Sequence, residues 1–236
     1  MSVFTTLEFT CPECGETLEY DNYDSINADR RPDLRDDIIT GSLSRVHCEA
    51  CDKDFRPEPS LNYLDYKNGI WVMAQPIYDL ARWGIQEEKT TKLFAGAYGV
   101  DAPASAREIG DGLTPRLAFG WAAFREKLVL KEADLDDLVL EKTKLTILAN
   151  REGNPVAAGV ELRLLNARER EFRMAWIDAT TGENLQQFDI QRALYDSIAE
   201  SDDWAEVDEK LNSGIFVDIQ RMFIEPAPVE TLEEAH

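Results

Sequence analysis

The four cysteines of this 236-residue chain form two C-x-x-C pairs, Cys11 with Cys14 and Cys48 with Cys51. Thiolates at this spacing bind zinc, and two such pairs complete a tetrahedral site with four sulfur ligands. A site closed by four thiolates leaves no position for water or substrate, so we expect it to be structural rather than catalytic. The sequence therefore predicts one structural zinc ion bound by Cys11, Cys14, Cys48 and Cys51.

Other uses of these cysteines stay open. Four thiolates also bind an iron centre, and C-x-x-C pairs occur in thiol redox chemistry and in disulfides. In the cytoplasm thiols stay reduced, which favours a metal over disulfides. His47 precedes Cys48 and imidazole is also a zinc ligand. Adjacent residues of an extended segment point to opposite sides, so we expect His47 to lie outside the coordination sphere.

Strands and tight turns are expected to position the two cysteine pairs. Alternating apolar residues predict strands on both sides of the first pair, and Pro32 is well placed to begin a short helix that Gly41 ends. Asn68-Gly69 is a strong signal for a tight hairpin turn. We expect one small antiparallel sheet, pinned by the metal, with strands at 5–10, 16–23, 61–67 and 70–75.

The rest of the chain predicts helices and a second group of strands. Thr114 followed by Pro115 predicts the start of a helix that reaches Leu128, and Asp134 is expected to cap a helix that ends near Ala149. The segment 100–112 is rich in Gly, Ala and Asp and predicts a loop. Further helices are expected at 77–98, interrupted near Gly84, and at 190–199 and 204–211, and further strands at 160–165, 171–178 and 185–190.

These elements predict an α+β fold. We expect three parts: a zinc-knuckle antiparallel β domain with a trailing helix at 1–99, an α+β domain with helices and a small sheet at 113–225, and a disordered acidic tail at 226–236.

The charge of the chain limits its partners. The formal net charge is −21, and the segment from Asp196 to His236 carries twelve acidic residues against Lys210 and Arg221. Binding along nucleic acid needs exposed Lys and Arg, so nucleic acid is a poor expectation, whereas a basic protein partner would be attracted. The sequence shows neither a signal peptide nor an apolar run of about 20 residues, so we expect a cytoplasmic protein with no membrane contact.

Several short motifs resemble the CpXC domain, a bacterial and archaeal family named after two Cys-Pro-x-Cys motifs. They are Phe9 to Gly15 around the first pair, Asp24 to Ala28, Pro32-Asp33-Leu34 and Gly41-Ser42-Leu43. The resemblance is specific over residues 5–76 and implies that the four cysteines act as one set. The second motif departs from the pattern, because Glu49 stands where the proline would be, and this implies a less rigid second turn.

Two other groups of side chains could do chemistry. Asp136, Asp137 and Glu141 could bind Mg²⁺ or Mn²⁺ in a hydrolase, although acidic residues in a first helical turn are explained more simply by the helix dipole. Four arginines, at positions 163, 168, 170 and 173, could form an anion or nucleic-acid surface. Glutamates alternate with them, so we expect cross-strand salt pairs instead.

The sequence contains no HExxH motif, phosphate-binding glycine loop or GxSxG elbow. We therefore expect a non-enzymatic protein-interaction adaptor or assembly subunit, in which zinc fixes the shape of a recognition surface. A homo-oligomer is compatible with this role. Two alternatives stay open: a zinc-ribbon regulator that contacts nucleic acid or the transcription machinery, and the metal-dependent hydrolase.

Overall fold

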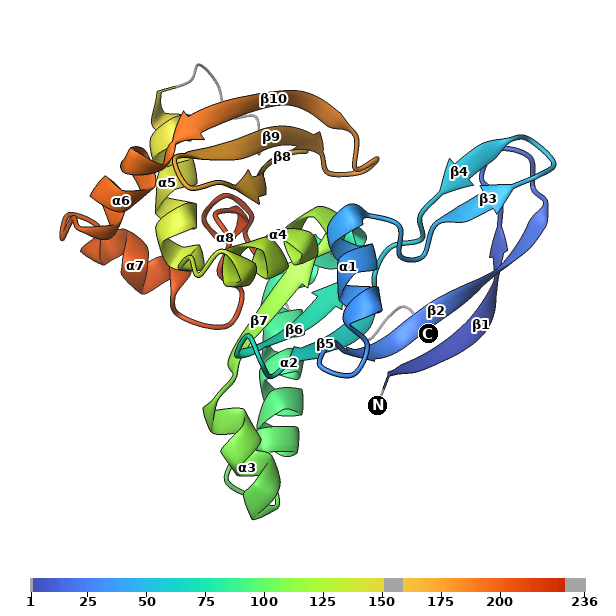
Figure 1. The fold of residues 1–236 in the computed structure, drawn as a ribbon, viewed down its shortest axis with the longest axis horizontal. Coiled ribbons are helices and arrows are strands. Elements are labelled where there is room, and N and C mark those ends of the chain that lie inside the picture. Colours follow the sequence, from blue (N-terminus) through green and yellow to red (C-terminus); the bar gives the residue numbers. More distant parts are fainter. Residues whose placement is uncertain (1, 151–158, 228–236) are drawn as a thin grey trace.

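The computed structural model describes residues 2–150 and 159–227 and shows an α+β protein, which confirms the predicted fold class (Figure 1). The strands are β1 (Val3–Thr10), β2 (Thr17–Asn27), β3 (Val46–Cys48), β4 (Lys53–Phe55), β5 (Leu61–Asp65), β6 (Ile70–Gln75), β7 (Thr114–Phe119), β8 (Val160–Ala167), β9 (Glu171–Asp178) and β10 (Asn184–Gln191). The helices are α1 (Pro32–Thr40), the 3₁₀ helix η1 (Ile77–Arg82), α2 (Trp83–Tyr98), α3 (Ala104–Asp111), α4 (Gly120–Glu132), α5 (Asp137–Ala149), α6 (Arg192–Ala199), α7 (Ala205–Leu211) and α8 (Gln220–Phe223).

The largest sheet has five strands in the order β1-β2-β5-β6-β7. The pairs β1·β2 and β5·β6 are antiparallel, whereas β2·β5 and β6·β7 are parallel. Parallel neighbours need long crossover connections. Helix α1 with the β3–β4 hairpin supplies the first crossover, and η1, α2 and α3 supply the second.

Both faces of the part of this sheet formed by β5, β6 and β7 are covered. On one face α1 and α4 pack over a core that includes Ile38, Tyr63 and Phe124, each fully buried. On the other face Leu117 and Phe119 of β7 meet Phe216 from the C-terminal segment. This part of the sheet is therefore sandwiched by elements from both ends of the chain.

The second sheet has three antiparallel strands in the order β10-β9-β8, at the positions where the sequence predicts strands. It packs against α4, α5 and α6 around a core that includes Leu140, Phe172, Met174 and Tyr195. Helix α4 contacts β6 and β7 of the first sheet and β8 of the second. This helix therefore joins the two sheets, as its central place in Figure 1 shows.

The predicted hairpin at Asn68-Gly69 is confirmed. Strands β5 and β6 pair antiparallel from Leu61 with Ala74 to Asp65 with Ile70, and Gly69 takes a left-handed conformation with φ of 64°. The expectation of a purely antiparallel sheet is wrong, because two of the four strand pairs are parallel.

The predicted helix start at Thr114 is also wrong, because residues 114–119 form strand β7 beside β6. Leu117 and Phe119 lie in the core on one face of the sheet, and Ala118 lies in the core on the other. This alternation has the period of a strand. Because Leu117, Ala118 and Phe119 are all apolar, the same residues also fit a helical spacing, and the sequence alone did not distinguish the two. The helix begins only at Gly120.

Two smaller expectations are corrected in the same region. Residues 104–111, expected as part of a loop, form helix α3, which packs along α2. Gly110 lies so close to Tyr98 that an added Cβ would be 2.6 Å from the Tyr98 Cβ.

The cap of α5 is Asp136 rather than Asp134, because the Asp136 carboxylate accepts hydrogen bonds from the N–H groups of Leu138 and Val139. Asp134 has a positive φ of 51° in the preceding turn.

The first sheet contains strands from both ranges predicted as domains, since β7 lies in 113–225 and its neighbours lie in 1–99. The two ranges are thus joined by strand pairing, and their division into separate domains stays a prediction. Ala227 donates its N–H to the carbonyl of Ala81 at 2.9 Å. The remainder of the predicted tail, 228–236, lies outside the described residues.

Candidate metal centre

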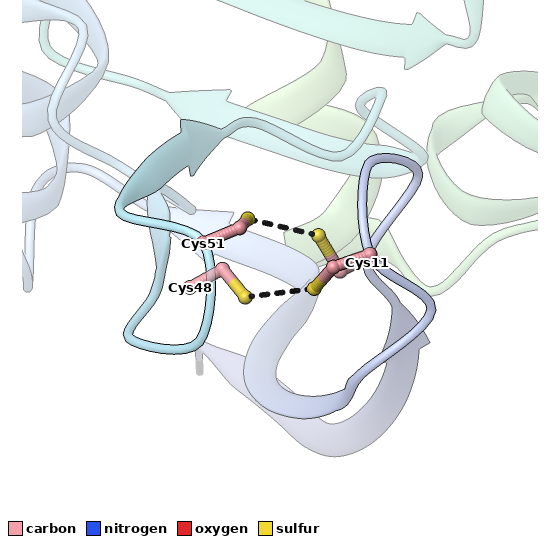
Figure 2. Close-up of side chains that lie close together, drawn as sticks. Cys11, Cys48 and Cys51 are labelled. Atoms are coloured by element: carbon pink, nitrogen blue, oxygen red, sulfur yellow. Dashed lines mark hydrogen bonds between the residues drawn. The ribbon is translucent and has the colours of Figure 1, made fainter.

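The four cysteines come from two turns that face each other (Figure 2). Cys11 and Cys14 lie in the turn between β1 and β2, while Cys48 ends β3 and Cys51 lies in the turn before β4. The two turns are far apart in sequence and meet only because the β3–β4 hairpin folds back beside the end of the β1–β2 hairpin (Figure 1). The predicted set of four cysteines is therefore one spatial cluster.

The geometry of the cluster fits a tetrahedral metal. All four Sγ atoms lie within 4.8 Å of one another, and the Cys11–Cys51 and Cys14–Cys48 Sγ pairs are 3.6 and 3.7 Å apart. Zinc bound by thiolates at about 2.3 Å requires sulfur atoms roughly 3.8 Å apart at the corners of a tetrahedron. A disulfide would require about 2 Å, and the cysteines are free thiols. The four cysteines could thus hold a metal ion.

The two turns share one backbone pattern. The N–H of Gly15 donates to the carbonyl of Cys11 at 2.9 Å, and the N–H of Asp52 donates to the carbonyl of Cys48 at 2.8 Å. Gly15 and Asp52 each follow the second cysteine of their pair, and both have positive φ, 80° and 56°. Asp tolerates this left-handed conformation better than most residues. The second turn therefore reaches the shape of the first without the motif proline.

The surroundings separate the acidities of the thiols. Burial opposes ionisation of Cys11, but hydrogen bonds from the backbone N–H groups of Cys14 and Glu13 lower its pKa to about 7. Burial and the neighbouring thiols, first among them Cys48, raise the pKa of Cys51 to about 12. The surroundings therefore favour the thiolate of Cys11, the form that binds metal, and disfavour that of Cys51.

His47 lies outside the cluster, as its place in an extended segment predicts. Its exposed ring faces Asp54, with Nδ1 at 2.9 Å from a carboxylate oxygen, and Nε2 is 3.6 Å from Asp52. The hydrogen bond that the protonated ring donates to the Asp54 carboxylate raises the pKa of His47. His47 is therefore not one of the clustered side chains that could hold a metal ion.

The three carboxylates considered for a hydrolase do not converge on one point. Asp136 caps α5, Asp137 pairs with Arg116 and Lys127 at 2.6 and 2.8 Å, and Glu141 accepts from Lys144 at 2.8 Å. Among residues 2–150 and 159–227, the cysteine set is the cluster of potential ligands close enough to hold a metal. Each carboxylate therefore has a structural partner, and the capping and ion-pair interpretation explains them.

Replacing Asp137 with asparagine is expected to lower the free energy of unfolding by about 3 kcal/mol at pH 7. Burial alone would raise the pKa of Asp137, but the charge of Lys127 and the hydrogen bond from Arg116 hold it well below its usual range. A depressed pKa in the folded state means that the stabilisation is complete above the unfolded value of about 4 and is lost as the pH falls through the folded value. The difference between wild type and Asp137→Asn in urea unfolding should therefore shrink below pH 4.

The exposed pair of Asp33 with Arg31 supplies the control, because Asp33→Asn removes a carboxylate from solvent and should change stability little. An Asp137→Asn variant as stable as Asp33→Asn at pH 7 would contradict a structural role for the ion pairs of Asp137.

The arginines of the second sheet divide between two roles. Arg173 forms the expected cross-strand pair with Asp189 of β10, and Arg168 pairs with Glu171 at 2.7 Å. Arg163 is instead buried and contacts Glu126, Glu161 and Asp218. Three of the four arginines are therefore paired with carboxylates, which argues against the alternative of a basic surface.

Sequence reasoning missed the buried charges around Arg163. Glu126 of α4, Lys144 of α5 and Asp218 of the C-terminal segment join it in one network that is shielded from solvent. The spacing of Lys144 three residues after Glu141 was a local signal. The other partners are distant in sequence, so their pairing could not be seen there.

The fold and the site define an α+β protein with a four-cysteine cluster between two hairpins. Residues 9–144, more than half of the chain, match the model of the CpXC protein family, so the chain belongs to this family and the resemblance is confirmed. No curated protein and no solved structure matches the chain. In the described part of the chain, no helix combines the length and the apolar character needed to cross a bilayer.

Proposed function

We propose that this protein binds one structural zinc ion and works in the cytoplasm as a non-enzymatic protein-interaction adaptor or assembly subunit. Four thiolates complete the coordination of zinc and leave no vertex for a substrate, which favours a structural role over catalysis. Reduced cytoplasmic thiols suit such a site better than disulfide bonds. The net charge of −21 favours a basic partner.

The edge strand β1 is the surface that supports a protein-binding role. Within the described residues, strand β1 pairs with β2 alone and so lies at an edge of its sheet, where unpaired backbone groups can pair with a strand of a partner. Three of its apolar side chains are exposed: Val3, Phe4 and Leu7. Exposed apolar groups on an open edge strand promote aggregation unless a partner covers them.

The cysteine cluster would set the shape of this edge. Strand β1 ends at Thr10, and Cys11 follows directly, so a bound metal would fix the end of the strand. The direct connection of β1 to Cys11 is the observation that carries the proposal, because it links a closed metal site to a surface for a partner.

Replacing Phe4 with lysine tests the proposal. Tagged wild-type protein purified from its native cells should retain a basic partner, and Phe4→Lys should lose that same partner because a charge on the edge opposes strand addition. Leu185→Lys on β10 is the matched control, since Leu185 is 53% exposed and Phe4 is 54% exposed. Quantitative mass spectrometry of the three samples gives the result.

A partner that is retained equally by wild type and Phe4→Lys would contradict binding at β1. A partner that Leu185→Lys also loses would show that added positive charge, rather than the edge strand, decides the interaction.

A further inference from the structure

A cleft of about 730 Å³ lies beside the cysteine cluster. Its walls come from the first cysteine turn, the end of α1, the segment after β4, the start of α4 and the turn after β9. The cleft therefore lies between the N-terminal cysteine turn with α1 on one side and the second sheet on the other. Three arginines line it: Arg45, Arg56 and Arg125.

The C-terminal end of α1 orients these three arginines. The Nε of Arg125 donates to the carbonyl of Ile39 at 2.6 Å, that of Arg45 to Gly41 at 2.7 Å, and that of Arg56 to Leu43 at 2.9 Å. A Cβ added to Gly41 would be 3.8 Å from terminal nitrogens of both Arg45 and Arg56, so these two guanidinium groups lie close together. Each side chain is thus held through Nε.

The terminal nitrogens are mostly left for other partners. Arg125 uses one of them to donate to the carbonyl of Leu165 at 3.0 Å. The Nη2 atom of Arg56 is shielded from solvent and has no hydrogen-bond partner. A buried donor without a partner costs free energy of folding, which an acceptor entering the cleft would recover.

Within the described residues, no carboxylate forms an ion pair with any of the three arginines. The four acidic side chains of the cleft are engaged elsewhere: Asp54 with His47, Glu58 with the N–H of Ile77, Glu161 with Arg163 and Gln220, and Asp178 with the N–H groups of Thr180 and Thr181. Burial and the charges of Arg45 and Arg125, only partly offset by Glu58, lower the pKa of Arg56 to about 10. The arginines therefore repel one another, in a chain whose acidic residues greatly outnumber its basic ones.

An aromatic wall adjoins the charges. The guanidinium carbon of Arg56 lies 3.7 Å from the centre of the Trp121 ring, and the indole N–H of Trp121 donates to the carbonyl of Pro57. Phe9, Pro12 and Phe55 add apolar surface to the same cleft. A ligand here would meet positive charge at one end and flat apolar groups at the other.

We propose that this cleft binds a small organic molecule that carries a doubly charged anionic group, a phosphate or a pair of carboxylates, on a flat apolar body. The anion contacts Arg45, Arg56 and Arg125, whose planar donor groups suit oxyanions. The body of the ligand lies against the apolar surface of Phe9, Pro12 and Phe55, because Arg56 already covers a face of the Trp121 ring. An extended polyanion fits less well, because the surface as a whole is strongly negative. This site does not depend on the protein-binding role of β1.

Calorimetric titration of the full-length, metal-loaded protein tests the site. Phenyl phosphate and phthalate are the probes, since each joins a dianion to a benzene ring, and benzyl alcohol supplies the ring without the charge. We expect one of the two anions to bind saturably at one site per chain, and benzyl alcohol to show no binding. The stronger of the two anions identifies the anionic group as phosphate or carboxylate.

Two arginine variants locate the binding. Arg45→Gln and Arg56→Gln should each weaken binding about tenfold or more, because each removes charged hydrogen bonds to the anion. Arg45 is exposed, so its variant should fold even if the half-buried Arg56 proves important for stability. Arg168→Gln changes the net charge equally outside the cleft, where Arg168 pairs with Glu171, and should leave the affinity unchanged.

Four results would overturn the proposal. The first is that neither anion saturates at millimolar concentration. The second is that Arg168→Gln weakens binding as much as Arg45→Gln does. The third is that the cleft variants keep full affinity and lose only thermal stability, which would show that the arginines serve to cap α1. A single-stranded oligonucleotide that binds more tightly than either probe would also rule out a small ligand.

Discussion

Replacing Lys144 with methionine is expected to lower the free energy of unfolding by about 3–5 kcal/mol, because it leaves buried carboxylates without their cation. Lys144 lies on α5 and has no exposed surface. Its Nζ donates to Glu126 at 2.6 Å and to Glu141 at 2.8 Å, and both glutamates are also fully buried. Methionine fills a similar volume, so the loss measures the charge rather than a cavity.

The rest of the network leaves little room for compensation. Arg163 is already engaged with Glu161 and Asp218, and the second oxygen of Glu141 accepts from the N–H of Ile219 at 3.0 Å. Burial would lower the pKa of Lys144, but Glu126 and Glu141 raise it, so the lysine stays charged. Burial raises the pKa of Glu141 to about 7 even with Lys144 present.

The cost of Lys144→Met should depend on pH. Without the lysine, the pKa of Glu141 in the folded state rises further above its unfolded value of about 4.3. A raised folded pKa favours folding at low pH, and this contribution is lost as the pH rises through the folded value. The difference between wild type and Lys144→Met should therefore grow from pH 5 to pH 8, as urea unfolding at several pH values will show.

Two further variants test the explanation. Lys92→Met removes a lysine from an exposed pair with Glu88 and should have a far smaller effect. Adding Glu141→Gln to Lys144→Met removes one unpaired charge and should restore part of the lost stability. A double variant less stable than Lys144→Met would show that the contacts of Glu141, rather than its charge, decide the result.

Replacing Cys48 with serine is expected to abolish metal binding and to disorder the N-terminal hairpins while the rest of the chain stays folded. Structural zinc contributes about 10–16 kcal/mol to the folding of small zinc domains, so its loss exceeds what short hairpins can withstand. Strands β3 and β4 have three residues each, and a hairpin of this size is marginal alone. The cores around Phe124, Phe172 and Phe216 lie away from the cysteine cluster and should persist.

Elemental analysis and hydrogen exchange measure these two effects. Wild type should contain one zinc per chain, and Cys48→Ser should contain none and should exchange rapidly at residues 46–55. His47→Ala is the matched control next to the ligand, and it should keep both the metal and the protection, because His47 contacts only Asp52 and Asp54 of the hairpin. Full metal content in Cys48→Ser would contradict coordination by four thiolates.

Local sequence spacing was sufficient for several structures that depend on neighbouring residues. The turn at Asn68-Gly69 and the strands β8 and β9 follow from alternation and from turn residues. The cysteine pairs were equally clear, because the two thiols of each pair are three residues apart and a metal demands the second pair. Even so, the matching shape of the second turn needed the structure, since Glu49 and Asp52 are not the expected motif residues.

Long-range packing decided what the spacing left ambiguous. Residues 114–119 satisfy a helical pattern, but their backbone pairs with β6, and the two faces of the sheet select the strand. Helix α3 was missed because none of its eight residues is buried and because the segment 100–112 is rich in Gly, Ala and Asp, a composition typical of loops.

The sequence by itself determined which four cysteines could hold a metal, the α+β class and the main hairpins of this protein, because these depend on side-chain chemistry and on short-range periodicity. Only the tertiary structure decided that Lys144 lies between two buried glutamates and that three arginines meet at the end of α1. The sequence does not show whether a charged side chain is surrounded by solvent or by protein. Their environment, and hence their energy and their function, is set by elements that are distant in the chain and that folding brings together.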